Sequence, residues 1–276
     1  MSISAKDVMK LREATGAGMM DCKKALTETD GDFDKAVEFL RKKGQKVSEK
    51  RADREANQGL VLIKISDDKK KASAIEINCE TDFVARNDDF QAQAQSFLNT
   101  AFEHETGTIE ELIGQKTDGI TIEKHLEEMV GKIGEKIEIS RVLHINTSGT
   151  LVKYIHPGNQ LGVIVEFEAE IDKDEVGKDV AMQIAAMNPL AVTRDGVDTS
   201  VVEKELEIAK EQLINEGKPA EIAEKAAQGK LRRFYEDRVL LEQKFVKDNG
   251  ISVKQYLEKE NVPLVRSFHR IQLGES

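Results

Sequence analysis

Apolar residues recur at helical spacing in the first 45 residues, where they predict three short helices. Ser4 is expected to cap the first helix, the second runs from Met19 to Glu28, and Asp32 is expected to cap the third. Three helices in so few residues form a domain with a small core. The inward-facing apolar residues of these helices are Val8, Leu11, Cys22, Ala25, Leu26, Ala36, Val37 and Leu40.

A basic segment follows these helices. Between Arg41 and Glu55 the sequence holds seven Lys and Arg residues against three Asp and Glu residues, a local charge of +4. Such a run is more often a solvated helix face than a docking strip for an acidic partner. We place a basic linker at residues 46–57.

The middle of the chain repeats a pattern of two strands and a helix at a spacing of 90 residues. Gly59 matches Gly149 at this spacing, and Phe90 matches Val180. Two such units predict paired α+β subdomains. The matching elements are strands at 60–65 and 74–79 with a helix from about 89, and strands at 150–155 and 162–168 with a helix at about 174–187.

Further elements lie between and after the two copies. Helices are expected around 110–112 and 122–133, and a helix at 252–260 is followed by a strand at 264–273. A strand is also expected at 136–145. The residues of that strand that share one face by parity are Ile137, Ile139, Arg141 and Leu143.

Residues 198–243 predict an antiparallel helical hairpin. Val202, Leu206, Ala209 and Leu213 recur at spacings of 4, 3 and 4, the seam of a coiled coil. A Gly-Lys-Pro break separates the two helices. The seam serves either packing within the hairpin or self-association, and the spacing alone favours neither, because two heptads rarely hold a dimer.

The segment from Glu76 to Arg86 carries the strongest local signal. Residues 75–79 alternate between apolar and polar, which is typical of a half-buried strand. The alternation stops at Thr81-Asp82-Phe83-Val84, and a helix is expected from about Asp89. An acid beside an aromatic ring at such a corner suits contact with a partner. From the spacing alone the alternative is that Asp82 caps a helical turn while Phe83 fills the domain's own core.

Composition narrows the function classes. The 276 residues carry a net charge of -10 and are 33% charged, which argues against a general nucleic-acid binder. The longest apolar stretch, Leu161–Phe167, is too short to cross a bilayer, and the first residues lack the apolar core of a signal peptide. The two cysteines, Cys22 and Cys79, form no disulfide framework or paired metal-ligand pattern, which fits a reducing cytoplasm.

No segment carries an enzyme's chemistry. The phosphate-binding pattern Gly-x4-Gly-Lys-Ser/Thr is absent, and Gly16–Asp21 lacks the last glycine of a dinucleotide loop. His156 lies in an expected hairpin turn beside a Pro-Gly pair, where a histidine is usually only solvated. No pair of carboxylates is singled out for acid–base work. We expect no enzymatic activity, no cofactor and no metal ligands.

Two long segments, Leu11–Leu26 and Glu76–Arg86, have a residue order typical of one protein family. They read LREATGAGMMDCKKAL and EINCETDFVAR. Shorter segments at Lys132–Glu135 and Tyr154–Gly158 agree with them. On these segments the chain closely resembles bacterial translation elongation factor Ts, over essentially its whole length.

The resemblance implies an α+β fold with an N-terminal three-helix domain like ubiquitin-associated domains, a core of two related subdomains and a protruding helical hairpin. Some family members continue past the last strand into a further helix that contacts the partner, whereas this sequence ends at Ser276. The expected parts are the three-helix domain at 1–45, the basic linker at 46–57, and core subdomains at 58–147 and 148–276, the second with the hairpin at 198–243.

The resemblance also implies a guanine-nucleotide exchange factor for elongation factor Tu, the GTPase that delivers aminoacyl-tRNA to the ribosome. Thr81, Asp82, Phe83 and Val84 would dislocate Mg²⁺ from that partner, with Phe83 wedged between helices of its GTPase domain and Asp82 near the Mg²⁺ surroundings. The other contacts it implies are Met19 and Met20 in the N-terminal domain, Ile133 and Gly134 near the nucleotide, and His156 on the second subdomain.

Two other function classes compete with this one. A peptide or ubiquitin-like adaptor would act through the three-helix domain and would not need the corner at Thr81–Val84. An RNA-binding ribosome accessory is suggested only by the local charge of +4, and the net charge of -10 opposes it. We expect binding to GDP-bound and nucleotide-free elongation factor Tu, no direct nucleic-acid or membrane binding, and a homodimer or 2:2 complex as a further possibility.

Overall fold

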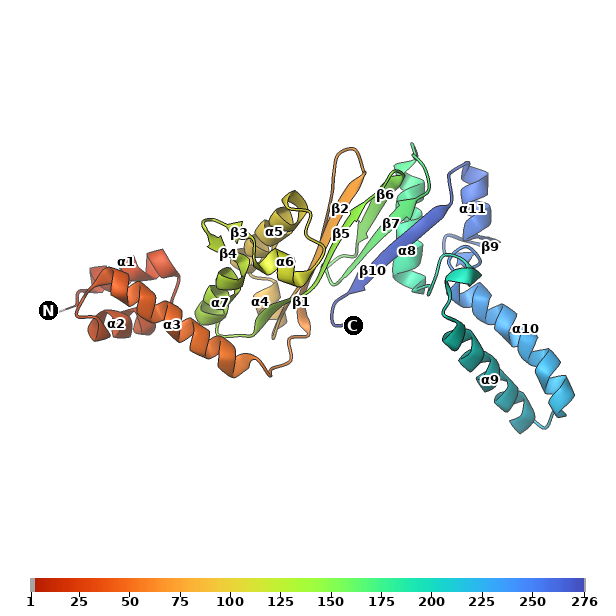
Figure 1. The fold of residues 1–276 in the computed structure, drawn as a ribbon, viewed down its shortest axis with the longest axis horizontal. Helices are drawn as coiled ribbons and strands as arrows, with labels where there is room; N and C mark the ends of the chain where they lie inside the picture. The colour runs from red at the N-terminus through yellow and green to blue at the C-terminus, as the bar shows by residue number, and fades with distance from the viewer. Residues whose placement is uncertain (1–2, 276) are drawn as a thin grey trace.

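The computed structural model describes residues 3–275, which form a small helical domain, a two-sheet core and a projecting helical hairpin (Figure 1). Ser4 and Asp32 cap the first and third helices by accepting backbone N–H groups, as the sequence predicts. The predicted apolar residues pack together as the core of this domain. Its helices are α1 (Ala5–Thr15), α2 (Met19–Glu28) and α3 (Phe33–Arg51).

Helix α3 is longer than the sequence pattern predicts. It continues to Arg51, past the expected end of the helical domain at residue 45, and residues 52–57 connect α3 to the core. Lys and Arg are good helix formers and stabilise the negative end of the helix dipole, which Lys50 and Arg51 occupy. Half of the predicted basic linker, residues 46–51, is therefore the last part of a helix.

The N-terminal domain docks on the core where α3 crosses α7 (Ile122–Ile133). Two glycines let the backbones touch there, because a Cβ on Gly131 would lie only 2.8 Å from the Cα of Gly44. An ion pair of 3.0 Å between Arg41 and Glu128 lies beside the crossing. The core thus supports a domain whose own apolar interior is small.

Two three-stranded antiparallel sheets form the core and share one topology. In each sheet a hairpin supplies an edge strand and the middle strand, and a third strand pairs with the middle one after an intervening helix. This mixture of helix and sheet agrees with the predicted α+β class. The first unit has β1 (Gln58–Ile65), β2 (Lys71–Cys79), α5 (Asp88–Glu103) and β5 (Ile137–Asn146), and the second has β6 (Thr150–Ile155), β7 (Leu161–Phe167), α8 (Asp174–Met187) and β10 (Val265–Gln272).

The spacing of 90 residues holds for individual hydrogen bonds in the two hairpin turns. The Ser66 N–H donates to the Lys71 carbonyl in the first turn, and the His156 N–H donates to the Leu161 carbonyl in the second, both at 2.9 Å. Each partner in the second turn lies 90 residues after its counterpart in the first. The two hairpins therefore have the same turn geometry.

The two units also bind each other reciprocally. The Val61 N–H of the first unit donates to the Asn159 carbonyl of the second at 2.7 Å. The matching pair with the roles exchanged is Leu151, which donates to the Lys69 carbonyl at 2.9 Å. Leu151 is the equivalent of Val61, and Lys69 is the equivalent of Asn159, so each unit makes the same contact to the other. Contacts across the two-fold axis of a symmetric dimer are reciprocal in the same way. These contacts relate the two hairpins of this single chain as an approximate internal two-fold axis would.

The sheets pack face to face, and helices cover their outer sides. Helices α5 and α7 cover the first sheet, while α8 and α11 (Val253–Glu260) cover the second. The middle layer between the sheets is apolar and buried. Its buried residues are Val61, Ile63, Ala72, Ala74, Leu151, Ile164 and Ile271.

Strand β2 is buried on both faces, which corrects the prediction of a half-buried strand. Every residue from Ala72 to Cys79 is buried, including Glu76 and Asn78. The Asn78 side-chain amide and the Gly274 N–H each donate to the Glu76 carboxylate at 3.0 Å. The C-terminal segment therefore covers these polar residues. Their alternation with apolar neighbours does not mean that one face of β2 is exposed to solvent.

A bulge changes which residues of β5 face the helices. The pairing of β5 with β2 shifts register after Ile139, so Ser140 has no residue opposite it. As a result Ile139 and Val142 both belong to the helix-covered core, while Leu143 packs in the layer between the sheets. The prediction that Ile137, Ile139, Arg141 and Leu143 share one face is wrong beyond the bulge.

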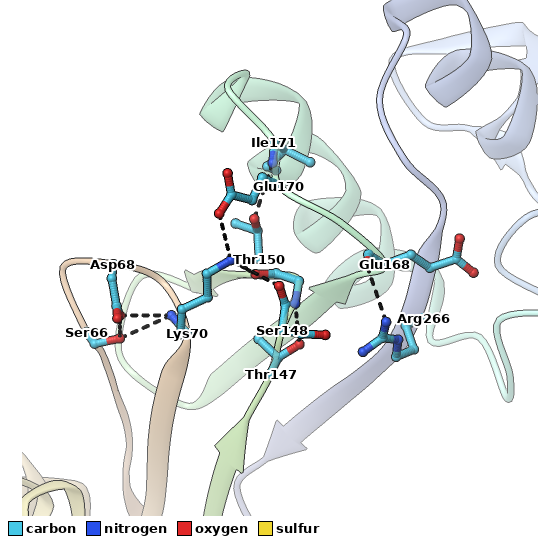
Figure 2. Close-up of polar contacts among 11 residues, drawn as sticks. Ser66, Asp68, Lys70, Thr147, Ser148, Thr150, Glu168, Glu170, Ile171 and Arg266 are labelled. Carbon is cyan, nitrogen blue, oxygen red and sulfur yellow. Dashed lines mark hydrogen bonds and ion pairs between the residues drawn. The ribbon is translucent and has the colours of Figure 1, made fainter.

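Lys70 joins the first hairpin to the start of the second unit (Figure 2). Its ammonium group donates to the carbonyl oxygens of Ser148 at 3.1 Å and Gly149 at 2.6 Å, and to the Glu170 carboxylate at 3.1 Å. An ammonium group has three N–H donors, so these contacts can use all of them. One side chain thus fixes the connection between β5 and β6 against the hairpin of the other unit.

The helical hairpin projects from the second unit (Figure 1). Ala209 and Leu213 of the predicted seam pack against Ala223 and Ala227 of the opposite helix. The seam is therefore covered within the chain. The hairpin consists of α9 (Thr199–Asn215) and α10 (Ala220–Arg238).

Several short elements complete the fold. The sequence predicts helix α6 (Ile109–Ile113) but not the two small hairpins. Three of their strands have only two residues and the fourth is mostly polar, so none leaves an apolar periodic pattern. The unexpected strands are β3 (Lys116–Thr117), β4 (Ile120–Thr121), β8 (Lys244–Phe245) and β9 (Asp248–Ser252).

Candidate functional site

The corner after β2 is one helical turn, α4 (Asp82–Ala85), that presents a phenylalanine to solvent. Thr81 caps this turn, since its hydroxyl accepts the Val84 N–H at 3.4 Å. Phe83 is 82% exposed, the highest exposed fraction among the large hydrophobic residues of the chain that the structure describes. The alternative that Phe83 fills the domain's own core is therefore wrong.

Asp82 follows the cap and does not itself form it. Its carboxylate lies 3.1 Å from the guanidinium of Arg86, one turn further on, and its side chain is 44% exposed. The alternative in which Asp82 caps the turn is wrong, because Thr81 occupies that position. The carboxylate is available at the surface beside the Phe83 ring.

Phe83 stands at the edge of a groove of about 640 Å³ between α4, α5, α7 and the N-terminal domain. Apolar side chains form part of its wall, and an ion pair of 3.2 Å between Lys132 and Asp89 lies along it. A surface of this kind buries apolar area when a partner covers it. The residues that line the groove include Thr15, Gly16, Phe83, Val84, Met129 and Ile133.

The loop between α1 and α2 reaches the same groove. Gly16 ends α1 in the left-handed conformation, with φ of 67°. A Cβ at this position would also lie 2.6 Å from the Cε of Lys132 on α7. The groove thereby unites the two sequence segments that carry the family resemblance, although they are far apart in the chain.

The remaining predicted contacts are not all in this groove. Ile133 lines it, and Gly134 ends α7 beside it with φ of 81°. Met19 and Met20 are exposed at the start of α2 but do not line the groove. His156 is exposed in the β6–β7 turn, where its Nδ1 lies 2.9 Å from the Tyr154 hydroxyl.

Two glutamates that sequence reasoning did not assign hold the corner in place. The Glu135 carboxylate accepts the Thr81 N–H at 3.0 Å and the Thr81 hydroxyl at 2.8 Å. The Glu80 carboxylate accepts the Lys136 N–H and an Arg51 guanidinium N–H, each at 2.6 Å. Both glutamates lie in matched sequence segments, but their partners lie 29 to 56 positions away in the sequence, so only the folded structure reveals what they bind.

The electrostatics of these groups follow from their partners. The Lys136 N–H, followed by Arg51, holds the pKa of Glu80 below its usual range. Burial, helped by the nearby Glu135, raises the pKa of the Cys79 thiol to about 12. At neutral pH Glu80 is thus an ionised acceptor, while Cys79 keeps its proton and donates to the Thr81 carbonyl at 3.2 Å.

Comparison with known proteins places this corner in a family. The family model described as Elongation factor TS matches residues 80–275, which include the corner and the turn after α7. Elongation factor Ts of Amoebophilus asiaticus (strain 5a2) is 49% identical over 277 residues, covering 99% of this chain and 100% of the relative. The chain belongs to the elongation factor Ts family.

Two further relatives in the elongation factor Ts family support the assignment. The protein of Christiangramia forsetii (strain DSM 17595 / CGMCC 1.15422 / KT0803) is 48% identical over 276 residues, covering 99% of both chains. That of Hydrogenovibrio crunogenus (strain DSM 25203 / XCL-2) is 45% identical over 276 residues, covering 100% of this chain and 92% of the relative.

Membership of the elongation factor Ts family makes the chain a translation elongation factor. The adaptor alternative is not favoured by these relatives. Within residues 3–275, no helix has the length and apolar character needed to cross a bilayer. In the same part of the chain, no three or more His, Cys, Asp and Glu side chains are grouped so as to hold a metal ion.

Proposed function

We propose that this protein is a nucleotide exchange factor that binds elongation factor Tu and promotes the release of GDP. The observation that carries the proposal is Phe83, a large ring that is 82% exposed on a firmly held turn beside a partly apolar groove. A ring so exposed contributes little to the stability of its own chain, and buried aromatic anchors contribute most of the binding energy at interfaces. Family membership supplies the partner.

Exchange follows from a coupling between two binding reactions. If this protein binds the nucleotide-free partner more tightly than the GDP-bound partner, it lowers the partner's affinity for GDP. GDP then lowers the partner's affinity for this protein by the same ratio. GTPases hold the nucleotide phosphates through backbone amides and Mg²⁺. A surface that displaces elements around this site therefore lowers GDP affinity without binding a nucleotide itself.

The resemblance to the elongation factor Ts family implies a role for each predicted contact residue. Phe83, supported by Val84, would insert between helices of the partner's GTPase domain, and the Asp82 carboxylate would act on the Mg²⁺ surroundings. Ile133 and Gly134 would press on the partner along the same groove. Contacts by Met19, Met20 and His156 would extend the interface, since all three are exposed.

The direct test is the release of a fluorescent GDP analogue from purified elongation factor Tu. We expect this protein to accelerate release in proportion to its concentration until the complex saturates. Release at the unassisted rate, at concentrations where the two proteins form a complex, would refute the exchange function. A truncation lacking residues 3–51 adds a discriminating measurement, because an adaptor acting through that domain would lose all binding.

We predict that the contribution of Asp82 depends on Mg²⁺. A carboxylate acts on the ion and its ligands, and that effect fades when the ion is already absent. Asp82→Asn should therefore slow GDP release at millimolar Mg²⁺ and lose most of this defect in a chelator, measured by the same fluorescence assay. Asp88→Asn, on an exposed carboxylate at the start of α5, is the matched control.

A defect of Asp82→Asn that is equal with and without Mg²⁺ would contradict this role. In that case the carboxylate acts by holding the ring through its pairing with Arg86.

Self-association through the hairpin is a second prediction. The apolar seam is covered within the chain. The remaining support for self-association is the exposure of Ile214 and Ile222 on the hairpin. Sedimentation at micromolar concentration should show a homodimer, or a 2:2 complex with the partner, that Ile222→Asp weakens. A monomer that forms only a 1:1 complex would rule out this arrangement.

A further inference from the structure

Two short segments of the core hold each other through exchanged carboxylates. In the segment before α4, Glu80 precedes Thr81, and in the turn after α7, Glu135 precedes Lys136. Glu135 accepts the N–H of Thr81, at 3.0 Å, and Glu80 accepts the N–H of Lys136, at 2.6 Å. Each glutamate thus binds the backbone of the residue that follows the other glutamate. We call these four residues the carboxylate clasp.

The clasp determines the orientation of the turn that carries Phe83. The Thr81 hydroxyl donates to Glu135 at 2.8 Å, so its lone pairs are free to accept the Val84 N–H that caps α4. The Thr81 carbonyl accepts from the Cys79 thiol. The N–H, hydroxyl and carbonyl of Thr81 are therefore all fixed by hydrogen bonds. Because Thr81 is fixed, the position of the helical turn that follows it is fixed as well.

The clasp also joins the two predicted contact segments. Ile133 and Gly134 immediately precede Glu135, and Phe83 lies two residues after Thr81. Arg51 at the end of α3 donates to Glu80 at 2.6 Å and adds the N-terminal domain to the same arrangement. Carboxylates that accept backbone N–H groups form strong, charge-assisted hydrogen bonds.

We propose that Glu135 and Glu80 are positioning residues for exchange, which fix Phe83 relative to Ile133 and Gly134 so that the three contacts enter the partner as one rigid unit. This inference rests on the proposed exchange function. Because the turn is already held in place, the free energy gained when the ring binds can drive the displacement of partner elements. It is not spent on ordering the turn. The glutamates themselves need not touch the partner.

The test is a double-mutant cycle between the clasp and the ring. Glu135→Ala should reduce the rate constant for GDP release about tenfold, the effect typical of losing a hydrogen bond to a charged group. In a Phe83→Ala background the same change should have an effect of less than about twofold, because the ring through which the clasp acts is already gone. Equal losses in both backgrounds, or no loss in the parent, would overturn the proposal.

Two variants control for general damage to the fold. Glu135→Gln is isosteric and keeps one carbonyl oxygen as acceptor, so its loss in release rate should be smaller, about threefold, and should also vanish without the ring. Glu138→Ala removes a neighbouring carboxylate that pairs with the Lys136 ammonium at 3.0 Å but does not reach the corner. This control variant should promote GDP release at the parent rate. A tenfold loss of the release rate in this variant would count against the proposal, because it would show that the assay responds to general damage to the fold.

Amide hydrogen exchange examines the clasp without the partner. The N–H groups of Thr81 and Lys136 should exchange slowly in the parent protein and at least about tenfold faster in Glu135→Gln. Both amides should respond, since the two hydrogen bonds support each other. Unchanged protection would refute the clasp even if the parent promotes GDP release, whereas a parent without exchange activity but with these protected amides would refute only the proposed function.

Discussion

Replacing Phe83 by alanine should abolish most exchange activity and leave the fold intact. Truncation of a central aromatic anchor typically costs about 2–4 kcal/mol of binding, which corresponds to a loss of about 30- to 700-fold in affinity for the partner. The ring is 82% exposed, so its removal should change the free energy of unfolding by no more than about 0.5 kcal/mol. Stopped-flow release of a GDP analogue and thermal unfolding measure the two quantities.

Two other apolar truncations serve as controls for this result. Phe90 lies on α5 and is fully buried, so Phe90→Ala should cost the protein about 3–5 kcal/mol of stability. Val246 is 40% exposed between β8 and β9, and Val246→Ala should affect neither property. If Phe83→Ala melts as early as Phe90→Ala, or releases GDP like the parent, the ring is not the anchor.

Alanine at either of two equivalent glycines should strongly destabilise the core. A Cβ on Gly59 would lie 2.0 Å from the Ile77 carbonyl oxygen, and a Cβ on Gly149 would lie 1.8 Å from the Phe167 carbonyl oxygen. These distances are far inside van der Waals contact, and both obstacles are backbone atoms of a middle strand. We expect each substitution to cost about 3 kcal/mol or more, measured by urea denaturation followed by circular dichroism.

Gly229→Ala provides the matched control. Gly229 lies inside α10, and a Cβ there would meet no atom within 4 Å. The substitution should stabilise the helix by about 0.5–1 kcal/mol, because alanine has the higher helix propensity. Unfolding of Gly59→Ala or Gly149→Ala at the parent's urea midpoint would contradict the close approach at these positions.

Features encoded within a few residues were predictable from the sequence. The cap at Ser4 and the bounds of α2 and α7 follow from the residues near each helix end, which include Gly18 before α2 and Gly134 after α7. The repeat was visible because Gly59 and Gly149 occupy equivalent, sterically forced positions. Features set by distant packing were not predictable. The two buried faces of β2 depend on a second sheet. The continued part of α3 is formed by good helix formers, but it is also held by distant contacts, of Val47 with the first core and of Arg51 with Glu80.

The candidate site shows the same division. Spacing placed an acid and a ring at a strand-to-helix corner, but it could not decide whether Phe83 faced the core or solvent. The answer depends on Phe90 and Phe97 already filling the space beneath α5. Glu135 was visible as part of a family segment, yet its role requires the contact with Thr81 from another part of the chain. A single sequence does not display such a contact.

The base of the helical hairpin has a consequence for folding kinetics. The Leu190 N–H donates to the Arg238 carbonyl at 2.8 Å, and the Leu240 N–H donates to the Ala191 carbonyl at 2.9 Å. Ala191 and Val239 form a parallel bridge, so the chain leaves the core and returns to it at adjoining points and in the same direction. We therefore expect the hairpin to close as a local unit early in folding. It then adds little to the loop-closure entropy that is lost when β10 pairs with β7.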